Sequence, residues 1–126
     1  MIESLFFDKI YNLLLQTDDQ ETKIKSLEIL ANLIHSEEQR LRLAKNEYLK
    51  RVYEVYQSDR QVSERILENI SWLTTLISFY PDMIEQIIRL NLLDFIIKIC
   101  GPQFSSEIRS NAVLALSLLT YHDAMF

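Results

Sequence analysis

The chain has 126 residues, of which 48% are hydrophobic and 25% charged, proportions that are ordinary for one soluble domain with a core. One Gly and two Pro are too few for the many tight turns of a β-sandwich or barrel. The net charge of −5 argues against nucleic acid as a partner and gives a weak preference for basic partners.

Cysteine usage and the first residues predict the compartment. Cys100 is the single cysteine, so no intramolecular disulfide can form, which suits a reducing compartment. Acidic residues stand at the start of the chain, where a signal peptide carries Lys or Arg. No apolar run approaches the roughly 18–20 residues of a membrane span. We therefore expect a cytoplasmic protein, with the nucleus as the alternative, and no membrane association.

Apolar residues recur every three or four positions along almost the whole chain, which predicts helices. In chain order, the pattern holds over residues 5–14, 24–34, 37–44, 48–57, 66–77, 81–89, 92–99 and 108–119. Starts and stops between these segments are predicted at Thr17 or Asp18, Ser36, Ser58-Asp59, Pro81, Asn91, Gly101-Pro102, and Ser105 or Ser106. No stretch has the composition of a linker, so we expect a single domain.

Two kinds of helix recur in the same order at a shared step of about 42 residues, the range of HEAT and armadillo arrays. The first kind carries three apolar trios: Phe7, Ile10 and Leu13; Leu49, Val52 and Val55; Leu93, Ile96 and Ile99. The second kind carries three more: Leu27, Leu30 and Ile34; Ile70, Leu73 and Ile77; Ala112, Ala115 and Leu119. Two helix types in phase are harder to explain by chance than one amphipathic pattern.

The chain resembles the armadillo repeat family over nearly its whole length. Residues 107–120 look like the third and longest helix of a repeat, and residues 66–78 look like the same helix one repeat earlier. First helices are matched by residues 36–44 and 81–89, and second helices by residues 48–57 and 92–100. The resemblance implies an all-α fold, a right-handed superhelical α-solenoid of about two and two-thirds repeats of roughly 42 residues. It implies one domain, residues 1–126, divided into a partial repeat 1–35 and repeats 36–78 and 79–122.

This sequence departs from the family pattern in two places. Armadillo repeats usually carry Gly between the first and second helices, whereas this chain has Asn46 and Asn91 near those positions. Asn tolerates the left-handed conformation that such a turn needs, so the fold is still expected. Importin-α-type proteins place Trp and Asn four residues apart on the third helix, but Leu76 follows Trp72 here. The equivalent pairs are Ile29 with Leu33 and Leu114 with Leu118, so the Asn ladder that clamps peptides is absent.

The third helices of armadillo arrays line a concave face, which suggests the candidate site. The resemblance places these apolar residues there: Ile29, Leu33, Trp72, Leu76, Leu114 and Leu118. They predict an interface anchored by Trp72, or else they complete the core of a short, tightly curved array. Asn69 and Asn111 occupy equivalent positions and either hydrogen-bond the backbone of an extended peptide or face solvent. Arg65 and Arg109 either give charge selectivity at the groove edge or lie on a solvated side.

Catalytic patterns are missing from the sequence. His35 and His122 lie far apart, each expected just past a third helix, and no His/Cys/Asp cluster has the spacing of metal ligands. A chain with one Gly has no glycine-rich phosphate loop, and no nucleophile elbow is present. We therefore expect no enzymatic activity, no cofactor and no metal.

The functional expectation is a protein-interaction adaptor that binds a peptide or helical segment on its third-helix face. The alternative is a structural assembly subunit that associates through apolar ends, near Phe6 and Phe7 at one end and Tyr121 to Phe126 at the other. A weaker alternative is an importin-like receptor for basic peptides, which the acidic charge allows and the missing Asn ladder disfavours.

Overall fold

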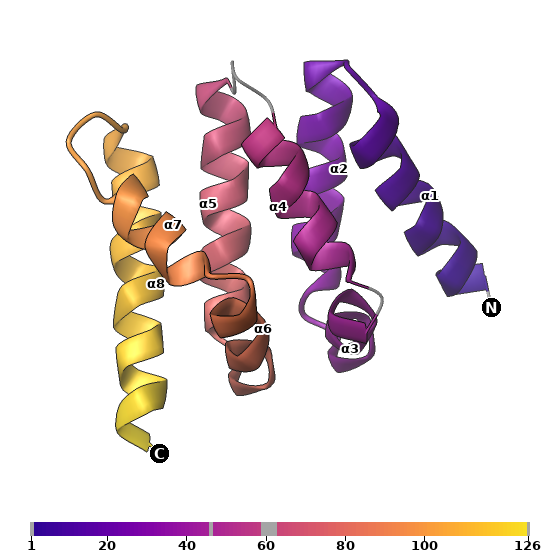
Figure 1. Ribbon diagram of the computed structural model, residues 1–126. Coiled ribbons are helices and arrows are strands. Elements are labelled where there is room, and N and C mark those ends of the chain that lie inside the picture. The colour runs from indigo at the N-terminus through magenta and orange to yellow at the C-terminus, as the bar shows by residue number, and fades with distance from the viewer. Residues whose placement is uncertain (1, 46, 59–62, 126) are drawn as a thin grey trace. The chain divides into compact units, whose positions relative to one another are not determined.

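The computed structural model describes residues 2–45, 47–58 and 63–125 (Figure 1). The described residues are all-helical, as predicted: they form eight α-helices and one short 3-10 helix, and they contain no strand. Within this part of the chain, no helix is both long and apolar enough to cross a membrane. The chain divides into two compact units, an N-terminal unit (Met1–Asn69) and a C-terminal unit (Ile70–Phe126), and the division falls inside one helix.

The N-terminal unit contains four helices and the beginning of a fifth. These are α1 (Ile2–Gln16), α2 (Gln20–Leu33), α3 (Glu37–Lys45), α4 (Tyr48–Ser58) and the first part of α5 (Glu64–Ser78). Helix α1 packs against α2 and α4, and α3 packs against α4 (Figure 1). The Tyr11 ring stacks on the Tyr48 ring with centroids 3.9 Å apart, and the Tyr48 hydroxyl donates a hydrogen bond to Asp8. This hydrogen bond raises the pKa of Tyr48 and fastens α1 to α4.

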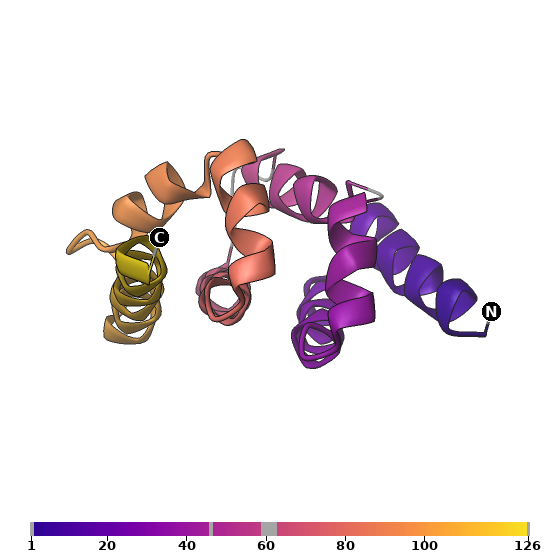
Figure 2. The same cartoon turned by 90° about the horizontal axis from the view of Figure 1, so that it is seen from below.

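The C-terminal unit contains the rest of α5 and the remaining helices. These are the 3-10 helix η1 (Pro81–Met83), α6 (Ile84–Arg89), α7 (Leu92–Ile99) and α8 (Ser106–Met125). In this unit, α6 and α7 lie on one side, and the C-terminal half of α5 and α8 lie on the other (Figure 2). The helix predicted over 92–99 has the predicted bounds. The predicted helix over 81–89 is split, because Pro81 begins a 3-10 turn that α6 then continues.

Polar side chains at the helix starts accept hydrogen bonds from backbone N–H groups that have no partner within the helix. The Ser36 and Ser105 hydroxyls accept from Gln39 N (3.4 Å) and Ile108 N (3.3 Å), as expected for caps of α3 and α8. Two other predicted caps are wrong by a few residues. Asp19, rather than Thr17 or Asp18, caps α2, and its carboxylate accepts from Thr22 N at 3.1 Å.

The start of α5 is the second corrected cap. Ser58 is the last residue of α4, and Asp59 lies outside the described residues. The Ser63 hydroxyl instead accepts from Ile66 N at 3.2 Å, immediately before α5 begins at Glu64. Ser58 and Ser63 are both good capping types, so residue type alone did not decide between them.

Among the described residues, two that are not glycine have the left-handed backbone conformation, each directly before a helix. Asn91 (φ 55°) precedes α7, as predicted, and its side-chain amide donates to the Asp94 carboxylate at 2.9 Å. Glu47 (φ 56°) precedes α4, whereas the sequence had suggested Asn46, which lies outside the described residues. Glu47 therefore adopts a conformation that its side chain does not favour.

The core of each unit follows the helical periodicity, with two corrections of register. The predicted trios Leu27/Leu30/Ile34 and Ile70/Leu73/Ile77 are buried throughout. However, Leu13 and Leu93, which belong to the trios of the first helix kind, are exposed. Their neighbours Leu14 and Leu92 are buried instead. A three-residue spacing and a four-residue spacing both keep a side chain near one face of a helix, so the pattern did not fix the register to one residue.

Candidate partner-binding surface

Three of the six apolar candidate residues are exposed on the helices that match third helices. Trp72 on α5 is 44% exposed, Leu114 on α8 is 40% exposed, and Ile29 on α2 is also exposed. Trp72 and Leu114 belong to the C-terminal unit and are 42 positions apart. A large exposed tryptophan in this position is the feature of the surface that most resembles a binding anchor.

Leu76 does not belong to an exposed stripe. Its side chain is only 6% exposed, so the expectation that it projects outward with Trp72 is wrong. The physical reason is that every residue of α5 from Leu73 to Ser78 is buried, so this half of the helix offers no free apolar face. Leu118 and Leu33, the matching residues of α8 and α2, are half-buried.

The two candidate asparagines make hydrogen bonds within their own units. The Asn69 amide donates to the Arg65 carbonyl at 2.8 Å, one turn back along α5. The Asn111 amide donates to the Ser71 hydroxyl at 2.9 Å, and the Thr75 hydroxyl donates to the Asn111 carbonyl at 2.7 Å. Asn111 therefore holds α8 against α5, and both asparagine side chains are half-buried rather than free on the surface.

His122 contributes to the same α5–α8 contact. It was expected just past the last helix, but it lies within α8 and is buried. Its Nε2 atom is 3.0 Å from the carbonyl oxygen of Ser78, the last residue of α5. This contact was not predicted, because the apolar pattern continues only through Leu119 and does not show where α8 ends.

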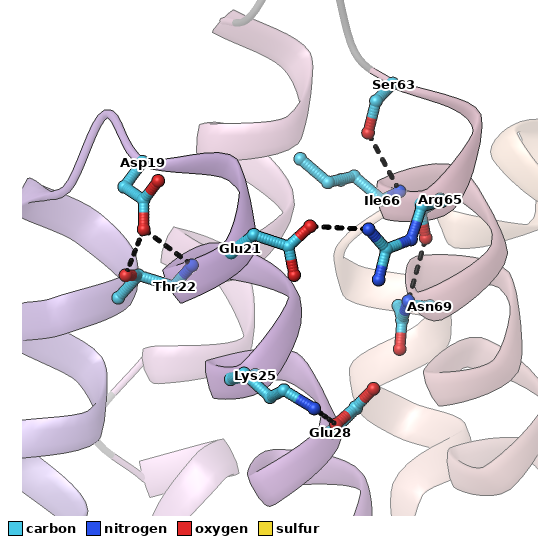
Figure 3. Close-up of polar contacts among 9 residues, drawn as sticks. All are labelled: Asp19, Glu21, Thr22, Lys25, Glu28, Ser63, Arg65, Ile66 and Asn69. Carbon is cyan, nitrogen blue, oxygen red and sulfur yellow. Dashed lines mark hydrogen bonds and ion pairs between the residues drawn. The ribbon is translucent and has the colours of Figure 1, made fainter.

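Charged residues cover the polar part of the N-terminal unit. Arg65, at the start of α5, forms an ion pair with Glu21 at the start of α2, with 2.5 Å between Nη1 and Oε1 (Figure 3). On α2, Lys25 and Glu28 are 3.5 Å apart in a second pair. All four side chains are largely exposed, so these pairs contribute little stability and yield readily to a competing charge. The candidate Arg65 is thus occupied within the chain.

One side of α8 is a shallow hollow that includes two candidate residues, Arg109 and Leu114. We call this surface the α8 stripe; its lining residues are Ser106, Arg109, Ser110, Val113, Leu114 and Ser117. These residues follow three- and four-residue steps and therefore lie along one face of the helix. Val113, which the sequence reading did not select, is 58% exposed. Its spacing from Arg109 and from the buried Ala112 and Ala115 was the signal that could have identified it.

Arg109 is the only ionisable side chain in the α8 stripe. It is exposed, and no ion pair joins it to a carboxylate among the described residues. Its position in the first turn of α8 puts a cation near the positive end of the helix dipole, which is electrostatically unfavourable. The stripe therefore combines an apolar centre with a cation that forms no ion pair in the described part of the chain.

A search of the same residues for metal ligands gives no site. Within the described ranges, no three His, Cys, Asp or Glu side chains gather in a way that would hold a metal ion. Cys100, the single cysteine, is half-buried at the C-terminal cap of α7.

Comparison of the chain with protein-family models, with curated protein sequences and with solved structures finds no match.

Proposed function

We propose that this chain is a non-enzymatic, armadillo-like protein-interaction module of the cytoplasm. It binds a peptide or a helical segment of another protein on exposed parts of its third helices, with Trp72 as the anchor. The binding works by surface complementarity and needs no cofactor. The proposed architecture is a right-handed solenoid of two and two-thirds repeats, with α2, α5 and α8 as the third helices.

Recurring local features support the repeat. The capping residues Asp19, Ser63 and Ser105 follow one another at steps of 44 and 42. The left-handed residues Glu47 and Asn91 are 44 positions apart. Buried side chains of α4 and α7 correspond at a step of 43, in the pairs Leu49 and Leu92, Val52 and Phe95, and Tyr53 and Ile96. Caps, turns and core positions thus recur together, within the period of armadillo and HEAT units.

The exposure of Trp72 is the single observation that supports the binding role best. Tryptophan buries a large area when it is covered, and it is the residue type most enriched among interface hot spots. Leu114, at the equivalent position of α8, is exposed to a similar degree. An importin-like use of this surface has less support, since Leu76 is buried and both Asn69 and Asn111 are engaged within the chain.

A displayed library of random peptides tests the proposal. The library is selected on the wild-type protein and depleted on Trp72→Ala, so that only Trp72-dependent peptides remain. Trp72 is the single tryptophan, so its own fluorescence reports binding directly. We expect peptides that shift this emission to shorter wavelength and bind Trp72→Ala at least about tenfold more weakly.

Ile88→Ala is the matched control, because Ile88 is 71% exposed on α6, away from the third helices. It should bind the selected peptides as wild type does. If no peptide is enriched, or if the selected peptides bind wild type and Trp72→Ala equally, the proposed role of this surface is wrong. Circular dichroism of each variant separates lost binding from lost fold.

A second candidate function, assembly through apolar ends, is favoured by the outer face of α1. Phe6 and Leu13 are exposed there, and a second hollow is lined by Lys9, Asn12, Leu13, Gln16 and Thr17. Phe126 and the Phe7 side chain, which were also suggested, lie outside the described residues. If the chain assembles through α1, light scattering will show a mass that rises with concentration, and Phe6→Ser with Leu13→Ser will restore a monomer. A concentration-independent monomer excludes this function.

A further inference from the structure

We propose that the α8 stripe binds an amphipathic α-helix of another protein, and that a carboxylate of this helix pairs with Arg109. The inference rests on the proposed function, because it names the kind of partner and the surface that receives it. It concerns Arg109, Val113 and the serines of α8 rather than Trp72, so the two can be tested separately.

The exposed residues of the stripe match the footprint of a helix. They continue beyond the hollow to Thr120 and Tyr121, which are also exposed. The exposed side of α8 that contains the stripe, from Ser106 to Tyr121, is therefore about 22 Å long at 1.5 Å per residue, the length of about four helical turns. Val113 and Leu114 form an apolar centre, while Ser106, Ser110 and Ser117 are small enough to let a second helix approach closely.

The α5–α8 contact within the C-terminal unit shows how such a face receives a helix. The Ser71 and Thr75 hydroxyls of α5 hydrogen-bond to Asn111 of α8 at 2.9 and 2.7 Å, and the Ser78 backbone carbonyl lies 3.0 Å from His122 Nε2. The residues 42 positions later on α8 are Val113, Ser117 and Thr120. Each of these is exposed, so α8 presents to solvent the same set of positions that α5 uses to hold α8. A helix is therefore the occupant that this face is shaped to receive.

The charge of the stripe selects among helices. Arg109 has no carboxylate partner among the described residues and lies where the helix dipole disfavours a cation. A carboxylate on the bound helix removes both penalties, and the apolar surroundings strengthen the pair once water is displaced. The chain's net charge of −5 acts against a strongly acidic partner. The best fit is thus a mainly apolar helical face with a single Asp or Glu at its edge.

A displayed library of amphipathic helical peptides, each about 15 residues long, tests the proposal. The apolar stripe of the peptides is varied among Ala, Leu, Ile and Phe, and the flanking positions among Glu, Lys and Gln. We expect enriched peptides to carry Glu at one flanking position. Binding measured by fluorescence anisotropy should weaken at least about tenfold for Val113→Arg, and also for Arg109→Glu. Changing the peptide Glu to Lys should restore binding to Arg109→Glu alone.

Ile88→Arg is the matched control, because it places the same charge on an exposed apolar position of α6 and should leave binding unchanged.

Enrichment without Glu, full binding by Val113→Arg, or no rescue by the charge swap would overturn the proposal. So would undiminished binding of a peptide whose helix is broken by a central Pro. A dimer in light scattering that Val113→Arg dissociates would make a second copy the occupant, which also overturns it. If selected peptides depend on Trp72 but not on Val113 or Arg109, the proposed function stands and this inference fails.

Discussion

Single side chains decide where the helices of this chain begin, and Asp19 does so through its charge. Its carboxylate accepts hydrogen bonds from the Thr22 hydroxyl (2.5 Å) and from Thr22 N (3.1 Å). These two bonds, the hydroxyl first, hold the pKa of Asp19 below its ordinary value of 3.8. Because the folded pKa is lower than the unfolded one, the ionised cap stabilises the fold above pH 3.8, and this contribution is lost as the pH falls through the folded pKa.

Asp19→Ala should therefore be less stable than wild type at neutral pH, and the difference should shrink as the solution is acidified. Urea unfolding at a series of pH values, with an NMR titration of the Asp19 carboxyl, measures both effects. Asp18→Ala is the control, since the Asp18 side chain is exposed and makes no hydrogen bond with the described residues. A difference between wild type and Asp19→Ala that is constant with pH would contradict the role of the charge.

Glu47 affects the stability of the fold through its backbone conformation rather than through its side chain. At φ 56°, a residue other than Gly destabilises the folded state by about 1 kcal/mol or more. Glu47→Gly removes this strain, although Gly also gains freedom in the unfolded chain, so we expect a net stabilisation of about 0.5–1 kcal/mol. Urea unfolding with an unchanged denaturant slope checks it. Glu54→Gly, inside α4, should instead lose about 1 kcal/mol, and equal losses at both positions would contradict the assignment.

The sequence predicted the left-handed turn at Asn91 but not the one at Glu47. Asn is a residue type that tolerates this conformation, so the turns were predicted at Asn46 and Asn91. Glu has no such preference, so its residue type gave no signal for this conformation. Residue preference can identify a turn that its own residue favours, but it cannot identify one at a residue that disfavours it.

At the scale of elements, the α5–α8 contact depends on a hydrogen bond between Asn111 and Ser71. Ser71 is buried and Asn111 is half-buried, so loss of this hydrogen bond should lower the stability of the fold. We predict that Asn111→Ala and Ser71→Ala each destabilise the protein, and that the double variant loses about 0.5–1.5 kcal/mol less than the sum of the two. A double-mutant cycle by urea unfolding measures this coupling. Strictly additive losses would show that the two side chains do not act together.

Helix positions were predicted well, and surface assignments less well. Periodicity identified the helices because each has several apolar residues on one face, and α7 has the predicted bounds. Trp72 and Leu114 are exposed, as the interface interpretation predicted, whereas Leu76 is buried, as the alternative of a completed core predicted. An apolar residue one turn from an exposed one is covered or free depending on which helices pack nearby, and spacing along the chain does not contain that information.

At the scale of the whole molecule, the two units share a helix. Their division lies between Asn69 and Ile70, inside α5, which continues from Glu64 to Ser78. Separated there, the units would keep pieces of α5 of six and nine residues. Helices this short are marginal in water without the rest of their turns, because nucleation is unfavourable. Unfolding of one unit should therefore destabilise the other through α5.

Leu30→Ala tests this coupling, because Leu30 is fully buried in the N-terminal unit whereas Trp72 lies in the C-terminal unit. The substitution should cost about 2–5 kcal/mol by opening a cavity. If the units unfold together, the urea midpoint followed by Trp72 fluorescence falls as far as the midpoint followed by circular dichroism. Leu41→Ala, an exposed position of the same unit, should change either midpoint little. A Trp72 transition unchanged by Leu30→Ala would mean that the C-terminal unit holds its part of α5 without help from the N-terminal unit.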